Sequence, residues 1–535
     1  MKVLSTKRKR EGDHHVSVLN LESALCLADE EDRKTYLERI AESRAPSAWY
    51  RFLMQTKHSD LPSTMTFHQQ TAETDQEKAQ VLSDFFSSVY VQSSYCNSHN
   101  LVHDELPTIT DFDCSQERVK TIIDSLDPTK ACGMDAIPAV VLKNVSATIA
   151  KSLSQLFNKI KQTCRFPDAW KIGVITAIHK KGSKVSVTNY RPVSLLSIVS
   201  KILERCIFLD LYAFLEPLFT PAQYGFRKGR SSVLQLLTFL NQIYRSIEEG
   251  KSVDVIYTDF EKAFDKVDHG ILLKKLWRLG VRRKLWKLIR SYLSYRRQAV
   301  RVGESLSGYT NVTSGVPQGS ILGPLFFLVM INDLPGEFVN DTLICADDTK
   351  IVSLSGKGLQ KDSSKLECWC EENQMKLNAD KCIHLRFNAK EMMLTPLSLY
   401  SQNLVTQSSH TDLGILFCSS LKWDDHILEK LAKANRSFHA VRRNAYGISP
   451  KAKINVYKTC ILPIITYASQ CWYASIGSLR RMELFQRKIL RWCYGEKATR
   501  DCHLAANILP ISLYLQLADL LFLSNASSSQ WKIRF

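Results

Sequence analysis

The stretch Leu343-Ile-Cys-Ala-Asp-Asp-Thr-Lys-Ile-Val352 carries the most informative local pattern in the chain. Short apolar runs flank an acidic turn, which predicts a β-hairpin with Asp347 and Asp348 at its tip. A second apolar run, Val253 to Tyr257, predicts a strand that leads directly into Asp259. If these strands are neighbours, the three carboxylates meet at one end of a sheet.

Carboxylates held on rigid strands suit one particular chemistry. Adding a nucleotide to a nucleic acid requires an activated 3′-hydroxyl and a polarised triphosphate, and two divalent ions roughly 3.5–4 Å apart supply both. Mg²⁺ prefers oxygen ligands and keeps waters and substrate phosphates in its shell, so the protein contributes few carboxylates. An Asp-Asp pair is weak evidence when taken alone, because helix capping explains a second such pair, Asp424-Asp425.

The segments around the carboxylates predict a mixed fold. From Asp111 to Cys418, β-rich runs alternate with amphipathic helices, which indicates a mixed α/β core. Packing helices are predicted upstream, over Thr35–Gln55 and Asp75–Tyr90. A further helix is predicted over Glu261–Leu276, and its apolar positions are Phe264, Val267, Leu272 and Leu276.

The last part of the chain is predicted to be helical. Asp424 or Asp425 would cap one helix, and Ser449-Pro450 would begin the next. The apolar stretch Leu504–Leu523 is interpreted as a packed helix, because polar residues and a proline interrupt it. A helix over Leu479–Trp492 opposes an apolar face to five basic residues, which are Arg480, Arg481, Arg487, Lys488 and Arg491.

Composition excludes several classes of protein. The 535 residues are 45% hydrophobic and 23% charged, so the chain is not mainly disordered. No apolar stretch is long enough to span a bilayer, and the polar N-terminus lacks the apolar core of a secretory signal. The 15 cysteines are scattered without metal-ligand spacing, which favours reduced and mostly buried thiols. Lys7-Arg-Lys-Arg10 could serve as a nuclear-import signal, although four basic residues at a terminus are more often simply solvated.

The charge of the chain is unevenly distributed. The net charge is +18, and residues 419–535 hold 18 basic and 7 acidic residues, or +11. Such a concentration suits a surface that follows a phosphate backbone, where each neutralised phosphate releases counterions. Solubility is the alternative explanation of the same charge.

Seven sequence blocks occur in the order seen in non-LTR (LINE-type) retrotransposon reverse transcriptases, and the chain resembles the jockey-like group in particular. The match runs from about Gly133 to Leu416 and continues more loosely through the basic C-terminal part. The blocks are Ala177-Ile-His-Lys-Lys-Gly182 with Asn189-Tyr-Arg-Pro-Val-Ser-Leu195, Gln223-Tyr-Gly-Phe-Arg-Lys-Gly-Arg-Ser231, Tyr257-Thr-Asp-Phe-Glu-Lys-Ala-Phe-Asp265, Ser314-Gly-Val-Pro-Gln-Gly-Ser-Ile-Leu-Gly-Pro324, Ala346-Asp-Asp-Thr349, Leu377-Asn-Ala-Asp-Lys-Cys382 and Asp412-Leu-Gly-Ile-Leu416.

This resemblance implies an α+β fold of the right-hand polymerase type, with fingers, an antiparallel-sheet palm and a helical thumb. Residues 1–110 would be an N-terminal helical extension, 111–253 the fingers, 254–418 the palm and 419–535 the basic helical thumb and C-terminal region. The reverse transcriptase domain would cover roughly residues 160–418. The implied partners are an RNA template, a DNA primer and deoxynucleoside triphosphates, with neither a membrane nor an obligate protein partner.

The resemblance also implies roles for the residues around the reacting groups. Asp259 and Asp347 would be the primary ligands of two Mg²⁺ ions, with Mn²⁺ as the alternative ion. Asp348 would assist them, and the Phe260 carbonyl would complete one metal shell. Lys381 matches the lysine that protonates the leaving pyrophosphate.

Other matched positions imply how the substrates bind. Lys180 and Arg191 match the positions that bind the triphosphate, a task that suits a point charge and a bidentate guanidinium. Gln318-Gly319 matches the loop that lies against the incoming nucleotide. Phe264 matches the steric gate that crowds a 2′-hydroxyl, with a helix-core position as its alternative. The Leu479–Trp492 helix resembles a thumb element that grips template and primer through phosphates.

The chain departs from the family at two points. Cys345 stands where the family usually has an aromatic residue that packs against the primer end, so we expect weaker primer positioning. Motifs of the family's endonuclease are not found upstream of Gly133, which indicates a polymerase piece of an element. The alternatives are a catalytically silent nucleic-acid-binding protein and a group II intron maturase-like or telomerase-type enzyme. The expected location is a ribonucleoprotein in the nucleus or cytoplasm, and the protein is not expected to be secreted.

Overall fold

The computed structural model describes residues 61–92 and 107–528, except 69, 355–356, 389–395, 446 and 496–499, together with parts of 31–42. The chain divides into a unit of Ser59–His410 and a second unit that contains Thr411–Phe535 and the N-terminal residues. The predicted nuclear-import signal, Lys7–Arg10, lies outside the described residues, as do residues 43–55 of the helix predicted near the N-terminus.

Five strands form the palm sheet of the larger unit, in the order β14-β11-β5-β10-β9. The central strand β5 (Val253–Thr258) runs antiparallel to β10 (Asp348–Ser353) and to β11 (Ile383–Phe387). β9 (Asp341–Cys345) pairs antiparallel with β10, whereas the edge strand β14 (Val405–Gln407) is parallel to β11. The predicted α+β fold with a mainly antiparallel palm is therefore confirmed.

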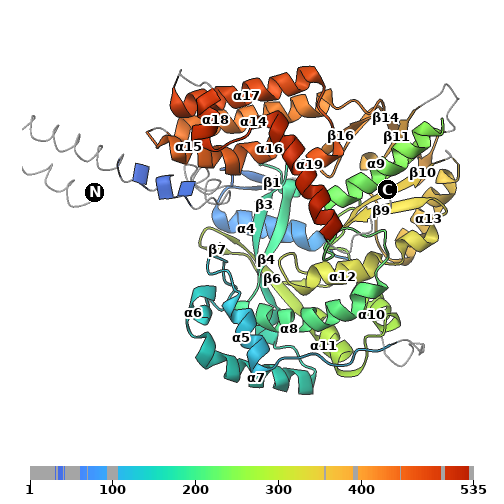
Figure 1. Ribbon diagram of the computed structural model, residues 1–535. Coiled ribbons are helices and arrows are strands. Elements are labelled where there is room, and N and C mark those ends of the chain that lie inside the picture. Colours follow the sequence, from blue (N-terminus) through green and yellow to red (C-terminus); the bar gives the residue numbers. More distant parts are fainter. Residues whose placement is uncertain are drawn as a thin grey trace, which may run out of the picture. The chain divides into compact units, whose positions relative to one another are not determined.

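Every residue of β5 is buried, because side chains pack on both faces of the sheet. On one face, the Tyr257 ring meets Phe239 of α9 (Ser232–Glu248), which lies along the sheet in Figure 1. On the other face, Ile256 belongs to a large apolar core together with α12 (Leu322–Ile331). This two-sided burial explains why β5 has an apolar sequence rather than an alternating one.

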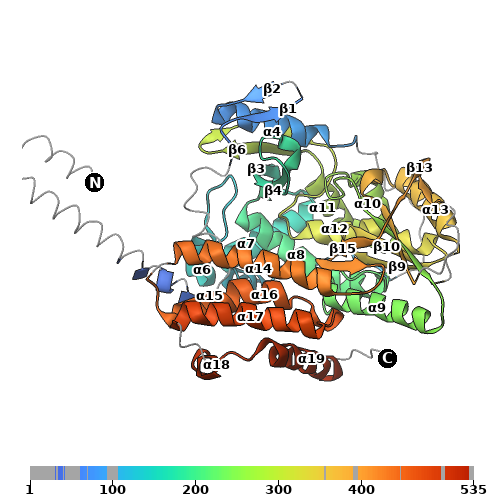
Figure 2. The same cartoon turned by 90° about the horizontal axis from the view of Figure 1, so that it is seen from above.

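The same unit contains a second sheet of five strands. Its path is β4-β3-β6-β7, with β8 paired to β6, and β3 and β6 are parallel. Helix α4 (Asp75–Ser88) packs on β6 through Val81, Leu82 and Phe86, and Figure 2 shows it beside β1 and β2. The strands are β1 (Met65–Phe67), β2 (Gln70–Ala72), β3 (Ile172–His179), β4 (Tyr190–Leu195), β6 (Arg296–Val302), β7 (Ser305–Leu306) and β8 (Thr310–Val312).

Two sequence predictions need correction in this unit. Residues 1–110 are not purely helical, because β1 and β2 form a hairpin whose strands of three residues are too short to show a periodic pattern. The helix predicted over Glu261–Leu276 begins only at His269, where Asp268 caps α10 (His269–Arg278). Residues 261–266 form turns instead. The apolar residues there have a helical spacing, but the left-handed backbone of Lys262 is incompatible with a helix.

The remaining helices of this unit pack on one another and on α12 or the palm sheet. α8 contributes the buried carboxylate of Glu204, whose Oε2 accepts hydrogen bonds from the backbone N–H groups of Ile321 and Leu322 at the start of α12. Burial raises the pKa of Glu204. These helices are α5 (Gln116–Asp124), α6 (Ala139–Asn144), α7 (Ser146–Thr163), α8 (Ile198–Leu215), α11 (Arg283–Leu293) and α13 (Leu359–Glu372).

The smaller unit is mostly helical, as predicted. Ser449 and Pro450 are the cap and first residue of α15, which confirms their predicted role. Its helices are α14 (Asp424–Asn444), α15 (Pro450–Val456), α16 (Leu462–Thr466), α17 (Ile476–Tyr494), α18 (Arg500–Ala506) and α19 (Ile511–Ser528), and β16 (Ile415–Cys418) precedes them.

Two predictions for this unit were wrong in detail. Trp423 occupies the cap position of α14, so neither Asp424 nor Asp425 caps that helix. Asp424 instead accepts hydrogen bonds from Ser475 and Ser478 at the start of α17. The stretch Leu504–Leu523 is not one packed helix, because Pro510 separates α18 from α19 and several leucines of α19 are exposed.

Two expectations from composition can also be compared with the described residues. Thirteen of the cysteines are described, and all are free thiols, of which only Cys368 is classed as exposed. Among the described helices, none is both long enough and apolar enough to cross a membrane.

Candidate active site

The palm sheet brings Asp259 beside the acidic hairpin. β5 ends at Thr258, which pairs with Thr349 of β10. One residue further along this antiparallel register, Asp259 lies opposite Asp348. The adjacency of the two strands, which local sequence patterns cannot establish, is therefore present.

The hairpin turn consists of Ala346 and Asp347, which join β9 to β10. Ala346 has a left-handed backbone with φ of 61°, which lets two residues reverse the chain. Asp347 lies at the tip as predicted, and Asp348 is the exposed first residue of β10. Burial raises the pKa of the Asp347 carboxyl, and the negative charge of Asp259 raises it further. The charge of Asp259 is therefore near enough to disfavour the ionised form of Asp347.

A cation near both groups would relieve the repulsion between their charges. In the described part of the chain, no group of three His, Cys, Asp or Glu side chains is gathered tightly enough to form a complete metal site. Mg²⁺ does not need one, because it keeps waters and substrate phosphates as ligands. The bridge between Phe260 and Leu377 is held by bonds from Glu261 N–H and Asn378 N–H, neither of which uses the Phe260 carbonyl. The donor set thus fits a hard divalent ion that is shared with substrate.

Three cationic side chains surround the carboxylates. Lys381 precedes β11, and its Nζ lies 3.0 Å from Oδ2 of Asp259. Lys180 follows the last residue of β3, and Arg191 lies on the paired strand β4, so the β3–β4 register brings them together. Burial lowers the pKa of Lys180, and the positive charges of Arg191 and Lys381 lower it further. An anion bound among these three groups would offset their mutual repulsion, and a triphosphate is such an anion.

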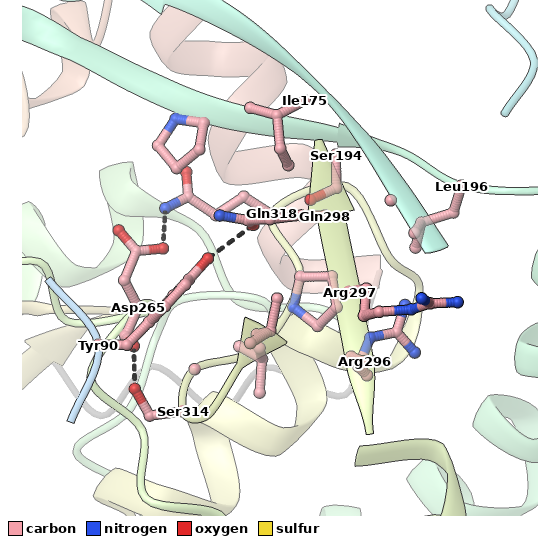
Figure 3. A pocket seen from close by; sticks show the side chains of 16 residues that line it. Tyr90, Ile175, Ser194, Leu196, Asp265, Arg296, Arg297, Gln298, Ser314 and Gln318 are labelled. Atoms are coloured by element: carbon pink, nitrogen blue, oxygen red, sulfur yellow. Dashed lines mark hydrogen bonds between the residues drawn. The ribbon is translucent and has the colours of Figure 1, made fainter. Parts of the chain in front are cut away.

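Gln318 is held by a residue that the sequence analysis did not single out. Its side-chain amide donates to Oδ1 of Asp265 at 2.8 Å, and its backbone carbonyl accepts from Ser194 N–H at 2.7 Å. Asp265 is buried, and the Ser314 hydroxyl donates to its backbone carbonyl. Figure 3 shows Gln318 pointing toward Asp265 in a small cavity, with Tyr90 close by. Asp265 closes the Tyr257–Asp265 block, so its position in that block was the available signal.

Gly319 needs to be glycine at this point in the loop. Its φ is +127°, and an added Cβ would lie 2.5 Å from the carbonyl oxygen of Ser194. Both the backbone conformation and the contact with β4 exclude a side chain. The loop therefore packs closely on the backbone of the second sheet, and its approach to an incoming nucleotide stays a prediction.

Phe264 lies in the turn after β5 rather than on a helix. Its ring stacks on Phe327 of α12, with centroids 4.5 Å apart and planes 17° apart. The Phe226 ring packs edge-on against another side of Phe264, with ring centroids 6.2 Å apart, and Phe226 is 53% exposed. A half-buried ring fixed by a core residue provides a rigid wall, which is what a steric gate requires.

The hairpin turn is supported by the Gln223–Ser231 block, for which the sequence analysis found no role. The side-chain oxygen of Gln223 accepts hydrogen bonds from Gly225 N–H at 2.7 Å and from Ala346 N–H at 3.1 Å. The backbone of Tyr224 also donates to the Ile344 carbonyl at 2.8 Å. Gln223 is 2% exposed. This block therefore positions the turn that carries Asp347.

Cys345 is the last residue of β9, immediately before the turn. Its thiol is half-buried and lies 3.9 Å from the Ser232 hydroxyl. The basic residues predicted to bind nucleic acid lie on α17 of the smaller unit. Arg480, Arg481, Arg487, Lys488 and Arg491 are all exposed there, opposite buried Met482, Phe485 and Ile489.

Asp265 provides a pH-dependent prediction. Burial raises its pKa to about 6 from the ordinary value of 3.8, so the folded state binds this proton more tightly than the unfolded chain. Burying the carboxyl therefore costs little below about pH 4, and the cost grows until the pH exceeds about 6. We expect Asp265→Asn to be more stable than the parent at pH 8, by on the order of 2–3 kcal/mol, and less so at pH 4.

Thermal unfolding of both proteins across this pH range would measure the difference. Asp168→Asn is the control, because the hydrogen bond from Lys171 lowers the pKa of Asp168. Removal of this carboxyl should therefore become more destabilising, rather than more stabilising, as the pH rises. A constant difference between Asp265→Asn and the parent from pH 4 to pH 8 would contradict the expectation.

The palm sheet, the carboxylates at its strand ends and the surrounding cations form the arrangement expected of a reverse transcriptase domain. Residues 178–415 match the family model described as reverse transcriptase (RNA-dependent DNA polymerase). The chain is 30% identical over 409 residues to the probable RNA-directed DNA polymerase from transposon BS of Drosophila melanogaster, which covers 72% of this chain and 44% of that protein. It is 30% identical over 406 residues to the RNA-directed DNA polymerase from mobile element jockey of the same organism, covering 71% and 44%. Residues 178–415 thus form a domain of the reverse transcriptase family, and most of the chain is similar to the RNA-directed DNA polymerases of jockey-like non-LTR retrotransposons.

A third relative of the same kind is the probable RNA-directed DNA polymerase from transposon X-element of Drosophila melanogaster, at 29% identity over 68% of this chain and 42% of that protein. The chain thus spans less than half the length of these curated relatives.

Proposed function

We propose that this chain catalyses RNA-directed DNA synthesis, adding deoxynucleotides to a DNA 3′-hydroxyl on an RNA template. One observation carries the proposal, namely that Asp259 and Asp347 lie at the ends of adjacent strands while Lys180, Arg191 and Lys381 lie near them. Negative groups for divalent ions and positive groups for a triphosphate are the two halves of a nucleotidyl-transfer site.

Each residue has a distinct task in this proposal. Asp259 and Asp347, assisted by Asp348 and the Phe260 carbonyl, would hold two Mg²⁺ ions, with Mn²⁺ as the alternative. Bound ions would activate the 3′-hydroxyl and stabilise the charge on the departing pyrophosphate. The protein side chains must in addition bind and orient the nucleotide before any bond changes.

The cations and the aromatic wall would orient the nucleotide. Lys180 and Arg191 would bind its triphosphate, and Lys381 would release Asp259 and donate a proton to pyrophosphate as it leaves. Gln318, oriented by Asp265, would lie against the nucleotide. The fixed ring of Phe264 would exclude a 2′-hydroxyl and so favour deoxynucleotides.

Primer extension by the purified full chain tests the proposal. A labelled DNA primer annealed to an RNA template is incubated with Mg²⁺ and either deoxynucleotides or ribonucleotides. We expect extension that requires the metal and strongly prefers deoxynucleotides. Failure to extend with either Mg²⁺ or Mn²⁺, in a sample that is folded and binds nucleic acid, would refute the activity.

A second candidate function is nucleic-acid binding without catalysis, and Cys345 favours it. The small thiol contacts Ser232, and at the end of β9 it cannot pack against a primer end as the aromatic residue usual in this family would. We expect Cys345→Tyr to increase primer extension several-fold, because better-held primer ends react more often. Steady-state extension rates of the two proteins would measure this gain, and Cys368→Tyr, at an exposed thiol, is the control. Extension by the variant but not by the parent would indicate that the natural chain binds nucleic acid without catalysis. Equal rates would show that Cys345 does not limit extension.

A further inference from the structure

Residues 282–302 form a strongly basic segment between the Asp259 block and the Gln318 loop. The segment contains eight Lys and Arg residues and no Asp or Glu. Two of the eight are used inside the fold: Arg282 lies over the Trp277 ring at 4.3 Å, and Arg296 donates to the Tyr292 carbonyl at 3.1 Å. The other six need a different explanation, because protein folding alone does not favour an unbalanced run of charge.

Most of the remaining charges are exposed along one path. Arg283 and Lys287 lie four residues apart on α11, and this face continues through Arg290 to Ser294 at the end of the helix. The opposite face of α11 is buried in the apolar core. Within the described part of the chain, no ion pair neutralises Arg283, Lys284, Lys287, Arg297 or Arg301.

Tyr295 stands where this path leaves the helix. Its side chain is 90% exposed, and its backbone is left-handed with φ of 56°. A left-handed conformation is costly for a tyrosine, and exposing the ring forgoes the free energy of burying it. An aromatic ring held in solvent among cations is the arrangement that proteins use to stack unpaired bases.

The ring borders an open hollow of about 660 Å³. Ser294, Asn311 and Thr313 give its wall hydrogen-bonding groups, and Arg297 gives it a positive charge. The wall also contains one acidic group, Asp168, which is paired with Lys171 at 3.0 Å. Arg297 lies over the Tyr309 ring at 5.6 Å.

This hollow is next to the loop that holds Gln318. His269 lines the hollow, and its Nε2 is 2.7 Å from the carbonyl oxygen of Gly315 in that loop. Arg296, Arg297 and Val312 line both the hollow and the small cavity beside Gln318. A strand lying in the hollow would therefore be close to the loop that carries Gln318.

We propose that Tyr295 and the basic face of α11 and β6 form a binding site for a single-stranded polynucleotide, which receives unpaired template next to the polymerase site. The strand is single because a duplex hides the faces of its bases from an isolated ring. Backbone phosphates contact Arg283, Lys284 and Lys287, while a base stacks on Tyr295. The assignment of the strand as template rests on the proposed polymerase function, whereas the binding site itself does not.

Binding is measured with the full chain and a fluorescent oligouridylate of about 12 nucleotides, the span that such surfaces occupy. Tyr295→Ala is expected to weaken binding roughly 5- to 100-fold, since that is the usual effect of losing one stacked base. Tyr295→Phe keeps the ring and should bind like the parent. Tyr473→Ala, at another tyrosine that is 66% exposed, is the matched control and should also bind like the parent.

The charged part of the path is tested by salt dependence. Lys284→Gln/Lys287→Gln should reduce the slope of log affinity against log salt by about 1 to 1.5, as expected for two lost phosphate contacts. Lys357→Gln/Lys361→Gln removes the same charge from exposed positions at the start of α13 and should leave the slope unchanged. An oligothymidylate arm distinguishes RNA from DNA as the preferred strand.

A photocrosslinking oligouridylate locates the contact independently of other binding surfaces. We expect a cross-link in the peptide that contains Tyr295. Unchanged affinity of Tyr295→Ala together with cross-links only at other peptides would overturn the proposal. Because binding needs no metal or catalysis, loss of binding in Tyr295→Ala without primer extension by the parent would refute the polymerase function and leave this site standing.

Discussion

Asp259→Asn should abolish primer extension, with a loss of roughly three orders of magnitude or more in rate. The asparagine has the same shape but no negative charge, so it cannot offset a divalent ion or the ammonium of Lys381, which lies 3.0 Å from Oδ2. The loss should appear in the rate of the chemical step, because nucleic-acid binding does not involve this carboxylate.

The measurement is single-turnover extension of a DNA primer on an RNA template, alongside binding of the same duplex. Asp425→Asn is the matched control, since Asp425 is the exposed second member of an Asp-Asp pair at the start of α14. That variant should extend primers like the parent. Extension by Asp259→Asn at the parental rate would show that Asp259 is not catalytic and would refute the proposed site.

Gly225→Ala should reduce extension by about 100-fold or more, because the hairpin that carries Asp347 would be displaced. A Cβ at this position would lie 2.4 Å from the Ala346 nitrogen and 3.0 Å from the Cys345 carbonyl carbon. Both neighbours are backbone atoms, so no side-chain rotation relieves the clash. The displacement would also strain the hydrogen bonds that Gln223 accepts from Gly225 and Ala346.

Gly336→Ala is the control for this substitution, since an added Cβ there meets nothing within 4 Å. Extension rates and thermal unfolding are measured for both variants. We expect Gly225→Ala to lower the rate constant of extension much more than the affinity for template and primer. A parental rate in Gly225→Ala would show that the turn tolerates displacement and would contradict the positioning role of this block.

Local sequence was sufficient for the parts of the site that depend on neighbouring residues. The apolar runs before Asp259 and around Asp347 predicted β5 and the β9–β10 hairpin, because a buried strand and a tight turn impose their patterns within about ten residues. The amphipathic pattern of α17 was equally readable. Local patterns failed after β5, where apolar spacing predicted a helix but a left-handed Lys262 makes turns.

Local sequence patterns did not predict contacts between residues that are far apart in the chain. Nothing local to Asp265 indicates that it is buried and bonded to Gln318, 53 positions away along the chain. The support of Ala346 by Gln223 spans 123 positions, and it appears in the sequence only as a block whose role was unassigned. Such pairings depend on how strands and loops pack, which a periodic pattern does not encode.

The sequence therefore established the carboxylates, their hairpin and the family resemblance, because these depend on residue type, short-range spacing and the order of motifs. Tertiary structure was needed to place Lys180, Arg191 and Lys381 around Asp259, and to place Tyr295 beside a hollow next to the Gln318 loop. The physical reason is that charges and rings act through space over a few ångströms, whereas the residues that bear them are separated by tens of positions in the chain.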